Sequence, residues 1–370
     1  MNQKTPLRPA ATYPAGGMAE KKNNHDRELW AVMIVALALL LLLLCLFVPV
    51  AWRRARADAA EWAEKHPETE QTGDAVTDKH QNAGETTEDV SAGSEPIIGD
   101  YLAVTTAKTQ IIAESAMDAS HAILVDLTTG EAVAQRLADE RIFPASMTKI
   151  MTVLVAVEAL TPAELETTFT MTAEIVDAAI AEGASRAGFE PGERVKLIDL
   201  LYGAALPSGA DATAALAQYL AGSEEKYVEL MNEKAGKLGL TETHFVNASG
   251  LHHDDHYSTV REIAALMAYA MENETCRKLL SAASYTTAAT EIHPYGITLY
   301  STTFSRMSTT TFGPVSVIAG KTGYTEEARF CLASLATRAD GREYVLVTVG
   351  GSSKYAPVYD CDAVYGKYLF

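Results

Sequence analysis

The sequence is poor in positive charge. Its 370 residues include 30 Lys and Arg against 48 Asp and Glu, which gives a formal net charge of −18. Because binding to a phosphate backbone requires a basic face, this balance argues against nucleic acid as a partner. Half of this net negative charge lies in residues 57–96, which carry 11 acidic residues and 2 Lys. Apolar residues make up 48% of the chain, enough for a sizeable core.

Cysteine is also scarce. The four cysteines, Cys45, Cys276, Cys331 and Cys361, include no CxxC pair and no zinc-knuckle spacing. Cys45 lies in an apolar run, where we expect it to act as a small hydrophobic side chain. The other three are too few and too scattered for a disulfide framework, which leaves room for a single bridge at most.

One hydrophobic run stands out from the rest of the chain. Residues 31–51 contain no charge, and these 21 residues, at about 1.5 Å per residue, can cross a bilayer as a helix. The run is longer than the apolar core of a secretory signal, and Pro49 lies where a small residue should precede cleavage. Trp30 and Trp52 flank it, as interfacial aromatics do. We therefore predict an uncleaved membrane anchor over residues 30–52.

Two polar segments flank the predicted anchor. Residues 1–29 contain Pro, Gly and Asn and are predicted to form a flexible tail. Residues 53–96 are poor in large apolar side chains and cannot bury enough surface to offset chain entropy, which predicts a disordered acidic linker. Because basic residues occur on both sides of the anchor, the positive-inside rule does not decide its orientation.

Residues 97–370 are predicted to form one folded domain. Strand patterns occur towards its two ends, with a helical region from Ser146 to about Leu280 between them and a closing helix from about Ala356. The predicted strands are Ala122–Leu127, Glu131–Gln135, Pro314–Ala319, Arg329–Thr337 and Glu343–Gly350. This order predicts an α/β (α+β) fold, in which an antiparallel sheet of about five strands from both chain ends is flanked by helices and carries an inserted all-helical region.

The segment Ser146–Lys149 (SMTK) combines a nucleophile with an amine. Ser-x-x-Lys spacing puts both side chains on one face of a helix. A second copy, Ser223–Lys226, opens a polar segment, so Ser223 is interpreted as a helix N-cap. In contrast, Lys149 is the only charged residue from Ser146 to Val157, which predicts a buried helix. Burial lowers the pKa of an amine and can make lysine a base; the alternative is a lysine that reaches the surface.

Two further segments carry candidate site residues. Leu206–Asp211 (LPSGAD) lies between helical segments and, taken alone, would be a turn or a helix cap. Gly320–Gly323 (GKTG) follows the predicted strand that ends at Ala319. A phosphate loop would need glycine where Val315 stands, so that interpretation is set aside. A lysine at a strand end can attract a carboxylate, and a glycine two residues later lets a substrate backbone approach closely.

In chain order, Ser-x-x-Lys, Ser-x-x and Lys-Thr-Gly resemble the signature of penicillin-binding proteins and serine β-lactamases. Several stretches resemble low-molecular-mass D-alanyl-D-alanine carboxypeptidases, namely Phe143–Thr152, Glu190–Glu193, Asp199–Gly203, Met231–Ala235, Phe245–Leu251 and His256–Thr259. The resemblance covers about residues 117–370 and implies a β-lactamase/D,D-peptidase-like fold. It also implies a catalytic domain outside the cytoplasmic membrane, held by residues 30–52 as a single-pass anchor, with residues 1–29 in the cytoplasm.

The resemblance implies catalytic roles for three side chains. Ser146 would attack the carbonyl of the penultimate D-Ala, and Lys149 would accept its proton, kept neutral partly by the charge of Lys321. Ser208 would relay a proton to the leaving D-Ala. Water would then release the acyl group, so neither a metal nor another cofactor is implied.

The resemblance also implies a substrate-binding strand. Lys321 and Thr322 would hold the free terminal carboxylate, with Gly323 and Tyr324 next to them. The backbone N–H groups of Ser146 and Tyr324 would form the oxyanion hole. The implied partners are peptidoglycan stem peptides ending in D-Ala-D-Ala, and β-lactams as acylating inhibitors.

One position departs from the family pattern. The family usually has Asn two residues after the serine of the second motif, where this chain has Ala210. Loss of one preorganised donor can cost on the order of 10²–10³ in rate. Two alternatives therefore stand beside the carboxypeptidase, namely an impaired scaffold or sensor that binds peptidoglycan or β-lactams, and a β-lactamase-like hydrolase. Glu190 precedes Ser208, the reverse of the order in class A β-lactamases, which argues against that class.

A histidine-rich segment, residues 252–256 (HHDDH), has the composition of a metal site. Catalytic zinc ligands are spaced by secondary structure rather than placed in five consecutive positions. We therefore expect a polar loop here and no metal.

Overall fold

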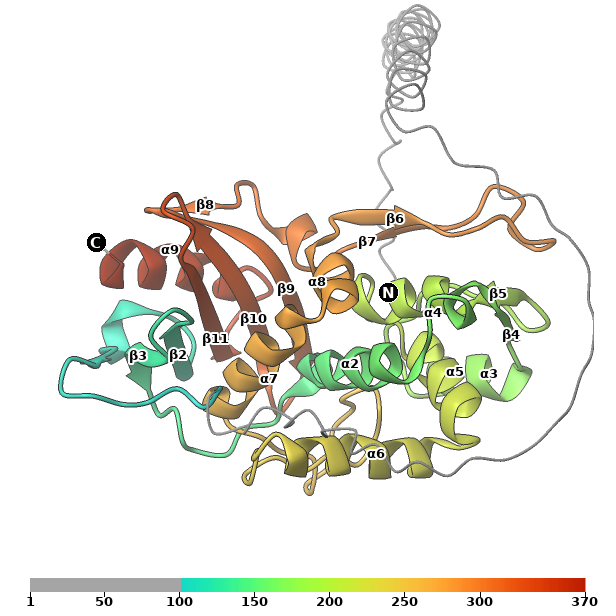
Figure 1. Ribbon diagram of the computed structural model, residues 1–370, viewed down its shortest axis with the longest axis horizontal. Helices are drawn as coiled ribbons and strands as arrows, with labels where there is room; N and C mark the ends of the chain where they lie inside the picture. Colours follow the sequence, from blue (N-terminus) through green and yellow to red (C-terminus); the bar gives the residue numbers. More distant parts are fainter. Residues whose placement is uncertain (1–100, 370) are drawn as a thin grey trace, which may run out of the picture. The chain divides into compact units, whose positions relative to one another are not determined.

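A seven-stranded sheet forms one side of the domain (Figure 1). The structure is a computed structural model that describes residues 101–369. The strand order is β1-β3-β2-β11-β10-β9-β8. The strands are β1 (Gln110–Ile111), β2 (His121–Asp126), β3 (Glu131–Arg136), β8 (Thr311–Phe312), β9 (Val315–Thr325), β10 (Arg329–Arg338) and β11 (Glu343–Gly351).

The predicted fold class is confirmed, with a correction to the sheet. Five strands, β3, β2, β11, β10 and β9, pair antiparallel in that order, as expected. The sheet is nevertheless mixed, because β1 adds to β3 in the parallel direction, and β8 adds a short antiparallel edge. Strands of two residues have no periodicity that a sequence pattern could reveal.

Both faces of the sheet are covered by helices. In β11, Val345 and Val347 face the core shared with helix α7 (Val260–Glu272), whereas Leu346 packs with residues of helix α9 (Ala356–Tyr368). Because successive side chains of a strand point to opposite faces, a strand buried on both faces is apolar throughout. The closing helix was therefore predicted correctly, and Figure 1 shows it on the side of the sheet away from α7.

The inserted region is mainly helical, but it is not all-helical as predicted. Besides α7, its helices are α2 (Lys149–Ala159), α3 (Ala173–Ala181), α4 (Leu197–Ala205), α5 (Ala210–Ala221), α6 (Glu224–Lys237) and α8 (Glu274–Ser281). A two-stranded ribbon of β4 (Thr168–Thr170) and β5 (Arg194–Lys196) interrupts it, and a hairpin of β6 (Ser284–Thr286) and β7 (Thr298–Tyr300) follows it. Short 3-10 turns are η2 (Glu114–Ala116), η3 (Ala145–Thr148), η4 (Glu164–Glu166) and η5 (Phe304–Arg306).

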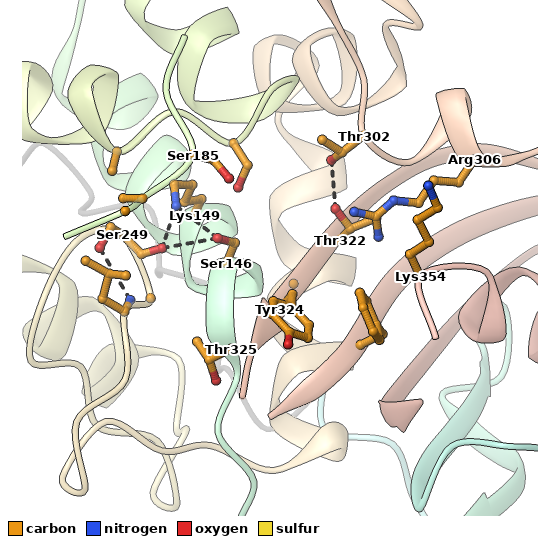
Figure 2. A pocket seen from close by; sticks show the side chains of 18 residues that line it. Ser146, Lys149, Ser185, Ser249, Thr302, Arg306, Thr322, Tyr324, Thr325 and Lys354 are labelled. Atoms are coloured by element: carbon orange, nitrogen blue, oxygen red, sulfur yellow. Dashed lines mark hydrogen bonds between the residues drawn. The ribbon is translucent and has the colours of Figure 1, made fainter. Parts of the chain in front are cut away.

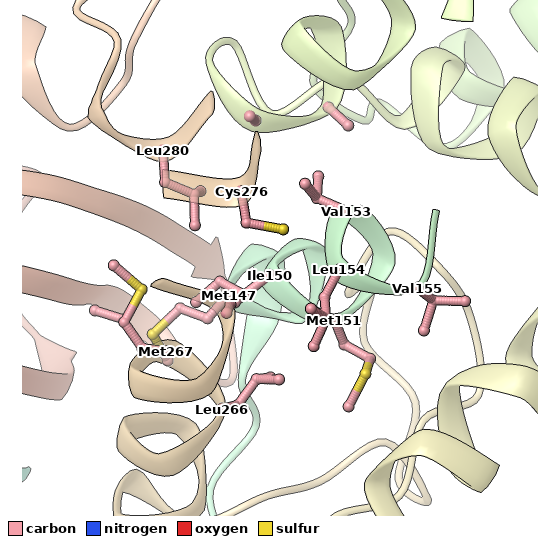
Figure 3. Packing of buried hydrophobic residues seen from close by; sticks show 14 of the residues in the cluster. Met147, Ile150, Met151, Val153, Leu154, Val155, Leu266, Met267, Cys276 and Leu280 are labelled. Carbon is pink, nitrogen blue, oxygen red and sulfur yellow. The ribbon is translucent and has the colours of Figure 1, made fainter. Parts of the chain in front are cut away.

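Helix α2 is the buried helix that its sequence predicts. Its residues from Lys149 to Val157 are all buried, and Figure 3 shows its apolar side chains enclosed by residues of α7 and α8. Thr152 is the one uncharged polar residue in this stretch, and its hydroxyl donates to the carbonyl of Ala248 at 2.7 Å. A buried hydroxyl with a partner avoids the desolvation penalty of an unpaired one.

Several sequence predictions concern other parts of the chain. The hydroxyl of Ser223 accepts a hydrogen bond from the backbone N–H of Lys226, so it is the N-cap of α6, as predicted. Cys276, Cys331 and Cys361 are buried free thiols. Cys45 and the predicted tail, anchor and linker lie outside the described residues. Within residues 101–369, no helix has both the length and the apolar character needed to cross a membrane.

The packing of α2 predicts how stability responds to truncation. Leu154 is fully buried in α2, whereas Leu230 on α6 is 41% exposed. We expect Leu154→Ala to lower the free energy of unfolding by about 2–5 kcal/mol, because it leaves a cavity. Leu230→Ala, the matched control, should cost about 0.5 kcal/mol or less. Urea unfolding followed by near-UV circular dichroism measures both, and equal losses would contradict this packing.

Candidate active site

The three sequence motifs converge on one cavity of about 380 Å³. It lies where η3 and α2, the α4–α5 turn, strand β9 and the loop after α6 meet, and Figure 2 shows the side chains that line it. Of the predicted site residues, Ser146, Lys149, Ser208, Thr322, Gly323 and Tyr324 line the cavity. Lys321 is buried directly behind them and contacts Ser208.

Ser146 and Lys149 form a close pair. Ser146 lies in the 3-10 turn η3, and Lys149 begins α2, so the chain turns tightly between them. The Lys149 Nζ atom lies 3.0 Å from the Ser146 Oγ atom and donates to the carbonyl of Ser249 at 2.5 Å. Lys149 is 2% exposed, so the alternative of a lysine that reaches the surface is wrong.

Burial sets the protonation of Lys149. It lowers the pKa of Lys149 to about 7, while the negative charges of Asp211 and Glu224 act in the opposite direction. Burial is therefore the largest cause that keeps this amine available as a base. The charges of Lys149 and Lys321 repel each other, and the expected contribution of Lys321 stays a prediction. An amine with a pKa near neutrality can accept a proton from a hydroxyl at 3.0 Å.

Two residues of the site have strained backbones. Ala145, directly before the nucleophile, has φ +47, and Ser208 has φ +66. Residues other than glycine rarely adopt positive φ, and such strain persists only where the surroundings fix it. At Ser208, the carbonyl oxygens of Tyr202, Gly203 and Ser185 accept from the backbone N–H groups of Leu206, Gly209 and Ala210. These bonds lock the turn that presents the hydroxyl of Ser208.

Lys321 lies within strand β9 and not beyond its end. The predicted strand stopped at Ala319, but β10 continues to pair with β9 as far as Thr325. Lys321 Nζ donates to Ser208 Oγ at 2.9 Å and to the carbonyl of Thr322 at 3.0 Å. Burial lowers the pKa of Lys321 well below its usual range, and the charges of Lys149 and Arg306 add to this effect. An incoming carboxylate would favour its ammonium form.

Gly323 lets β9 pass close to the nucleophile. A Cβ atom at this position would lie 3.0 Å from the carbonyl oxygen of Pro144 and 3.2 Å from the backbone nitrogen of Ser146. Any side chain would therefore push the strand away from the turn. The next residue, Tyr324, packs its ring against Phe330 with centroids 4.4 Å apart and ring planes tilted by 32°, and both residues line the cavity.

Sequence reasoning missed several residues of the cavity, among them Thr302, Arg306 and Lys354. Thr302 shares a hydrogen bond of 2.7 Å with Thr322, and Arg306 and Lys354 lie nearby in Figure 2. The Nη1 atom of Arg306 is buried but has no hydrogen-bond partner within residues 101–369. Arg306 precedes the third motif by a loop and a short strand, so no local pattern marks it.

Ala210 leaves part of the cavity wall without a side-chain donor. Its backbone N–H donates to the carbonyl of Ser185 at 2.7 Å. The next residue, Asp211, is fully buried and accepts from the backbone N–H groups of Ala187 and Gly188 at 2.8 and 3.1 Å. Ala210 and Asp211 thereby hold the loop at residues 185–188, and Ser185 of this loop lines the cavity next to Ala210. No sequence pattern indicated this role for Asp211.

The histidine-rich segment is a polar loop only in part. His252, His253, Asp254 and Asp255 are exposed, as expected, but His256 is 2% exposed and hydrogen-bonded to Thr148. Across the described part of the chain, no three His, Cys, Asp or Glu side chains are grouped so as to hold a metal ion.

Comparison with known proteins agrees with this geometry. A protein-family model described as D-alanyl-D-alanine carboxypeptidase matches residues 105–353. The chain belongs to the D-alanyl-D-alanine carboxypeptidase family. It is 35% identical over 234 residues to D-alanyl-D-alanine carboxypeptidase DacF of Bacillus subtilis, which covers 63% of this chain. It is 39% identical over 161 residues to DacC of Escherichia coli, which covers 42%. The chain spans 58% and 40% of the lengths of these two relatives.

Solved structures of this family share the fold. The DD-transpeptidase of Streptomyces K15 is 30% identical, with a TM-score of 0.61 over 69% of this chain and 99% of that one. A D-alanyl-D-alanine carboxypeptidase from Mycobacterium tuberculosis is 28% identical, with a TM-score of 0.59 over 70% of this chain and 92% of that one. The described domain therefore has the D,D-peptidase fold that the sequence resemblance implied.

The lowered pKa of Lys149 predicts a pH dependence. If the neutral amine accepts the proton of Ser146, labelling of Ser146 by a fluorescent penicillin should increase about tenfold per pH unit well below pH 7. It should level off above about pH 8, once the amine with a pKa of about 7 is neutral. Lys149→Met should abolish most labelling, and Lys226→Ala, in the second Ser-x-x-Lys copy, should not. A rate that does not change across this pH range would contradict the role of Lys149.

Proposed function

We propose that this protein is a serine-type D-Ala-D-Ala carboxypeptidase, a hydrolase that removes the terminal D-Ala of peptidoglycan stem peptides. The observation that carries the proposal is the Ser146–Lys149 pair, with 3.0 Å between hydroxyl and amine and a lysine pKa of about 7. Family membership supports the substrate class. The similar proteins favour neither alternative, and Ala210 is the observation that keeps the scaffold or sensor alternative open.

Acylation would proceed through the Ser146–Lys149 pair. Ser146 Oγ attacks the carbonyl carbon of the penultimate D-Ala while its proton passes to Lys149 Nζ. The negative oxygen that forms is directed to the backbone N–H groups of Ser146 and Tyr324, which the close approach at Gly323 brings near each other.

The leaving group would receive its proton from Ser208. As the C–N bond to the terminal D-Ala breaks, the hydroxyl of Ser208 gives its proton to the leaving nitrogen and recovers one from Lys321, 2.9 Å away. Water then attacks the ester on Ser146. Its proton passes through Ser208 to the neutral Lys321, and Lys149 returns its proton to Ser146 Oγ, which restores both lysines. β-Lactams would acylate Ser146 in the same way.

The terminal carboxylate would bind at the cationic end of the cavity. Lys321, Thr322 and Arg306 gather there, and Arg306 has a buried nitrogen without a partner among the described residues. A guanidinium is suited to a carboxylate because it offers two parallel donors. A peptide that ends here in a free carboxylate would bring a negative charge to these cations. A peptide chain that continues past this point would not.

The proposed location is the outer side of the cytoplasmic membrane. Residues 30–52 would anchor the chain, residues 1–29 would stay in the cytoplasm, and the acidic segment 53–96 would tether the domain near its peptidoglycan substrate. The support is the hydrophobic run without charges. Protease digestion of intact cells should cleave within residues 53–96, and protection of that segment would contradict this orientation.

The direct test is release of D-Ala. The purified full-length chain should release D-Ala from diacetyl-Lys-D-Ala-D-Ala, and Ser146→Ala should abolish the release. Ser223→Ala, which removes the hydroxyl of the other Ser-x-x-Lys copy, should retain it, because Ser223 only caps α6. Release that persists in Ser146→Ala would refute the mechanism. A folded wild-type chain without release would instead favour the binding or sensing role suggested by Ala210.

Arg306 predicts a preference for the free carboxylate. We expect Arg306→Ala to lower kcat/KM for the free acid about 10–100-fold, the loss typical of a hydrogen bond to a charged group, with a much smaller effect on the peptide amide. The ratio of kcat/KM for the acid to that for the amide measures this selectivity. Arg342→Ala is the control, since Arg342 pairs with Asp340 away from the cavity. An unchanged ratio in Arg306→Ala would show that Arg306 does not bind the carboxylate.

A further inference from the structure

The carbonyl group that orients the Lys149 amine belongs to a loop held by polar contacts. The loop consists of residues 245–251, which follow α6, and the Ser249 carbonyl accepts from Lys149 Nζ at 2.5 Å. On one side of this carbonyl, Ala248 accepts from the Thr152 hydroxyl at 2.7 Å. On the other side, Gly250 lies so close to Ala145 that a Cβ atom would overlap the Ala145 carbonyl oxygen. A small shift of this loop would therefore move the Ser249 carbonyl and, with it, the amine of Lys149.

His256 ties the start of this loop to the nucleophile turn. Its ring is 2% exposed and lies between two partners. The backbone N–H of Val246 donates to Nδ1 at 3.1 Å, so Nδ1 is the unprotonated nitrogen. Nε2 therefore carries the hydrogen and donates to the Thr148 hydroxyl, 2.8 Å away. Thr148 is the residue between Ser146 and Lys149 that directly precedes the lysine.

The ring remains neutral over the working pH range. Burial lowers the pKa of His256 to about 3, and the charges of His244, His253, Lys149 and His252 act in the same direction. A neutral imidazole keeps one donor and one acceptor, as this bridge requires. His256 therefore does not exchange protons in the reaction.

We propose that His256 is a positioning residue for proton transfer from Ser146 to Lys149, because its bridge between Thr148 and Val246 holds the loop whose Ser249 carbonyl orients the lysine amine. The inference rests on the proposed function, in which Lys149 is the base. Misplacement of a catalytic group by about 1 Å can cost on the order of 10² in rate, even when the substitution lies away from the reacting atoms.

The charged groups around Lys149 are not altered by a change at His256. Asp211 on α5 and Glu224 on α6 act on the amine, and the amine in turn acts on Lys321 of β9. Glu224 also accepts from the backbone N–H of Ala248, so it holds the same loop from the side of α6. Loosening of the loop would admit water to Lys149 and shift its pKa back towards the value of a free lysine.

Substitutions at His256 can separate the two halves of the bridge. In His256→Gln, the side-chain amide reaches the place of Nε2 and keeps a donor to Thr148. In His256→Asn, the amide reaches the place of Nδ1 and keeps an acceptor for the N–H of Val246. His256→Ala removes both. Thr148→Val removes the hydroxyl on the other side, with Thr148→Ser as its matched control. His253→Ala is the control for the loop, since His253 is exposed.

The experiment measures three quantities on the full-length chain. They are the acylation rate of Ser146 by a fluorescent penicillin as a function of pH, D-Ala release, and hydrogen exchange of the amides of residues 246–251. We expect His256→Ala and Thr148→Val to slow acylation about 10–100-fold. The pH range over which the acylation rate rises, here called the acid limb, should also move to higher pH. The Gln and Asn variants should lie between these and wild type. His253→Ala and Thr148→Ser should match wild type.

The outcomes distinguish this inference from the proposed function. If wild type acylates and His256→Ala does so at the same rate and with the same acid limb, the positioning role is wrong. If His256→Ala does not fold, the Gln, Asn and Thr148→Val variants decide in the same way. If wild type neither acylates nor releases D-Ala, the proposed function fails. Hydrogen exchange alone then tests the bridge, and unchanged protection of residues 246–251 in the variants would refute it.

Discussion

The site depends on the burial of one lysine amine. Lys149 begins a helix that is apolar on all sides, and its position there removes water from the amine and lowers its pKa to about 7. The same burial would be costly without partners, and the Ser249 carbonyl and the Ser146 hydroxyl supply them. A buried, hydrogen-bonded, neutral amine beside a hydroxyl is the arrangement that can activate a serine without histidine or metal.

The architecture brings two such pairs together from distant parts of the chain. The insertion of the helical region between the strands places the turn at Ser208 beside β9, so that Ser208 pairs with Lys321 as Ser146 pairs with Lys149. Strain at Ala145 and Ser208 accompanies both serines. Backbone hydrogen bonds of the surrounding turns hold these conformations, so stability elsewhere maintains the geometry of the site.

Much of this could be predicted because its signals are local. The spacing of Ser146 and Lys149, the apolar helix after them and the apolar runs of the sheet strands are all short-range patterns. What could not be predicted depends on contacts distant in sequence. The extension of β9 through Lys321 follows from pairing with β10, and the left-handed backbone of Ser208 follows from its neighbours. Arg306 has no motif, and the segments that contain His256 did not indicate its bridge, since contacts distant in sequence bring both residues to the site.

The central claim is that burial makes Lys149 a neutral base, and NMR titration of its side chain tests it most directly. The full-length chain would be labelled with ¹³C at lysine Cε, and the Lys149 resonance would be assigned by its loss in Lys149→Met. The account predicts a midpoint near pH 7, in line with the pKa of about 7 that burial produces. A midpoint near the value of an exposed lysine, about 10.4, would contradict it.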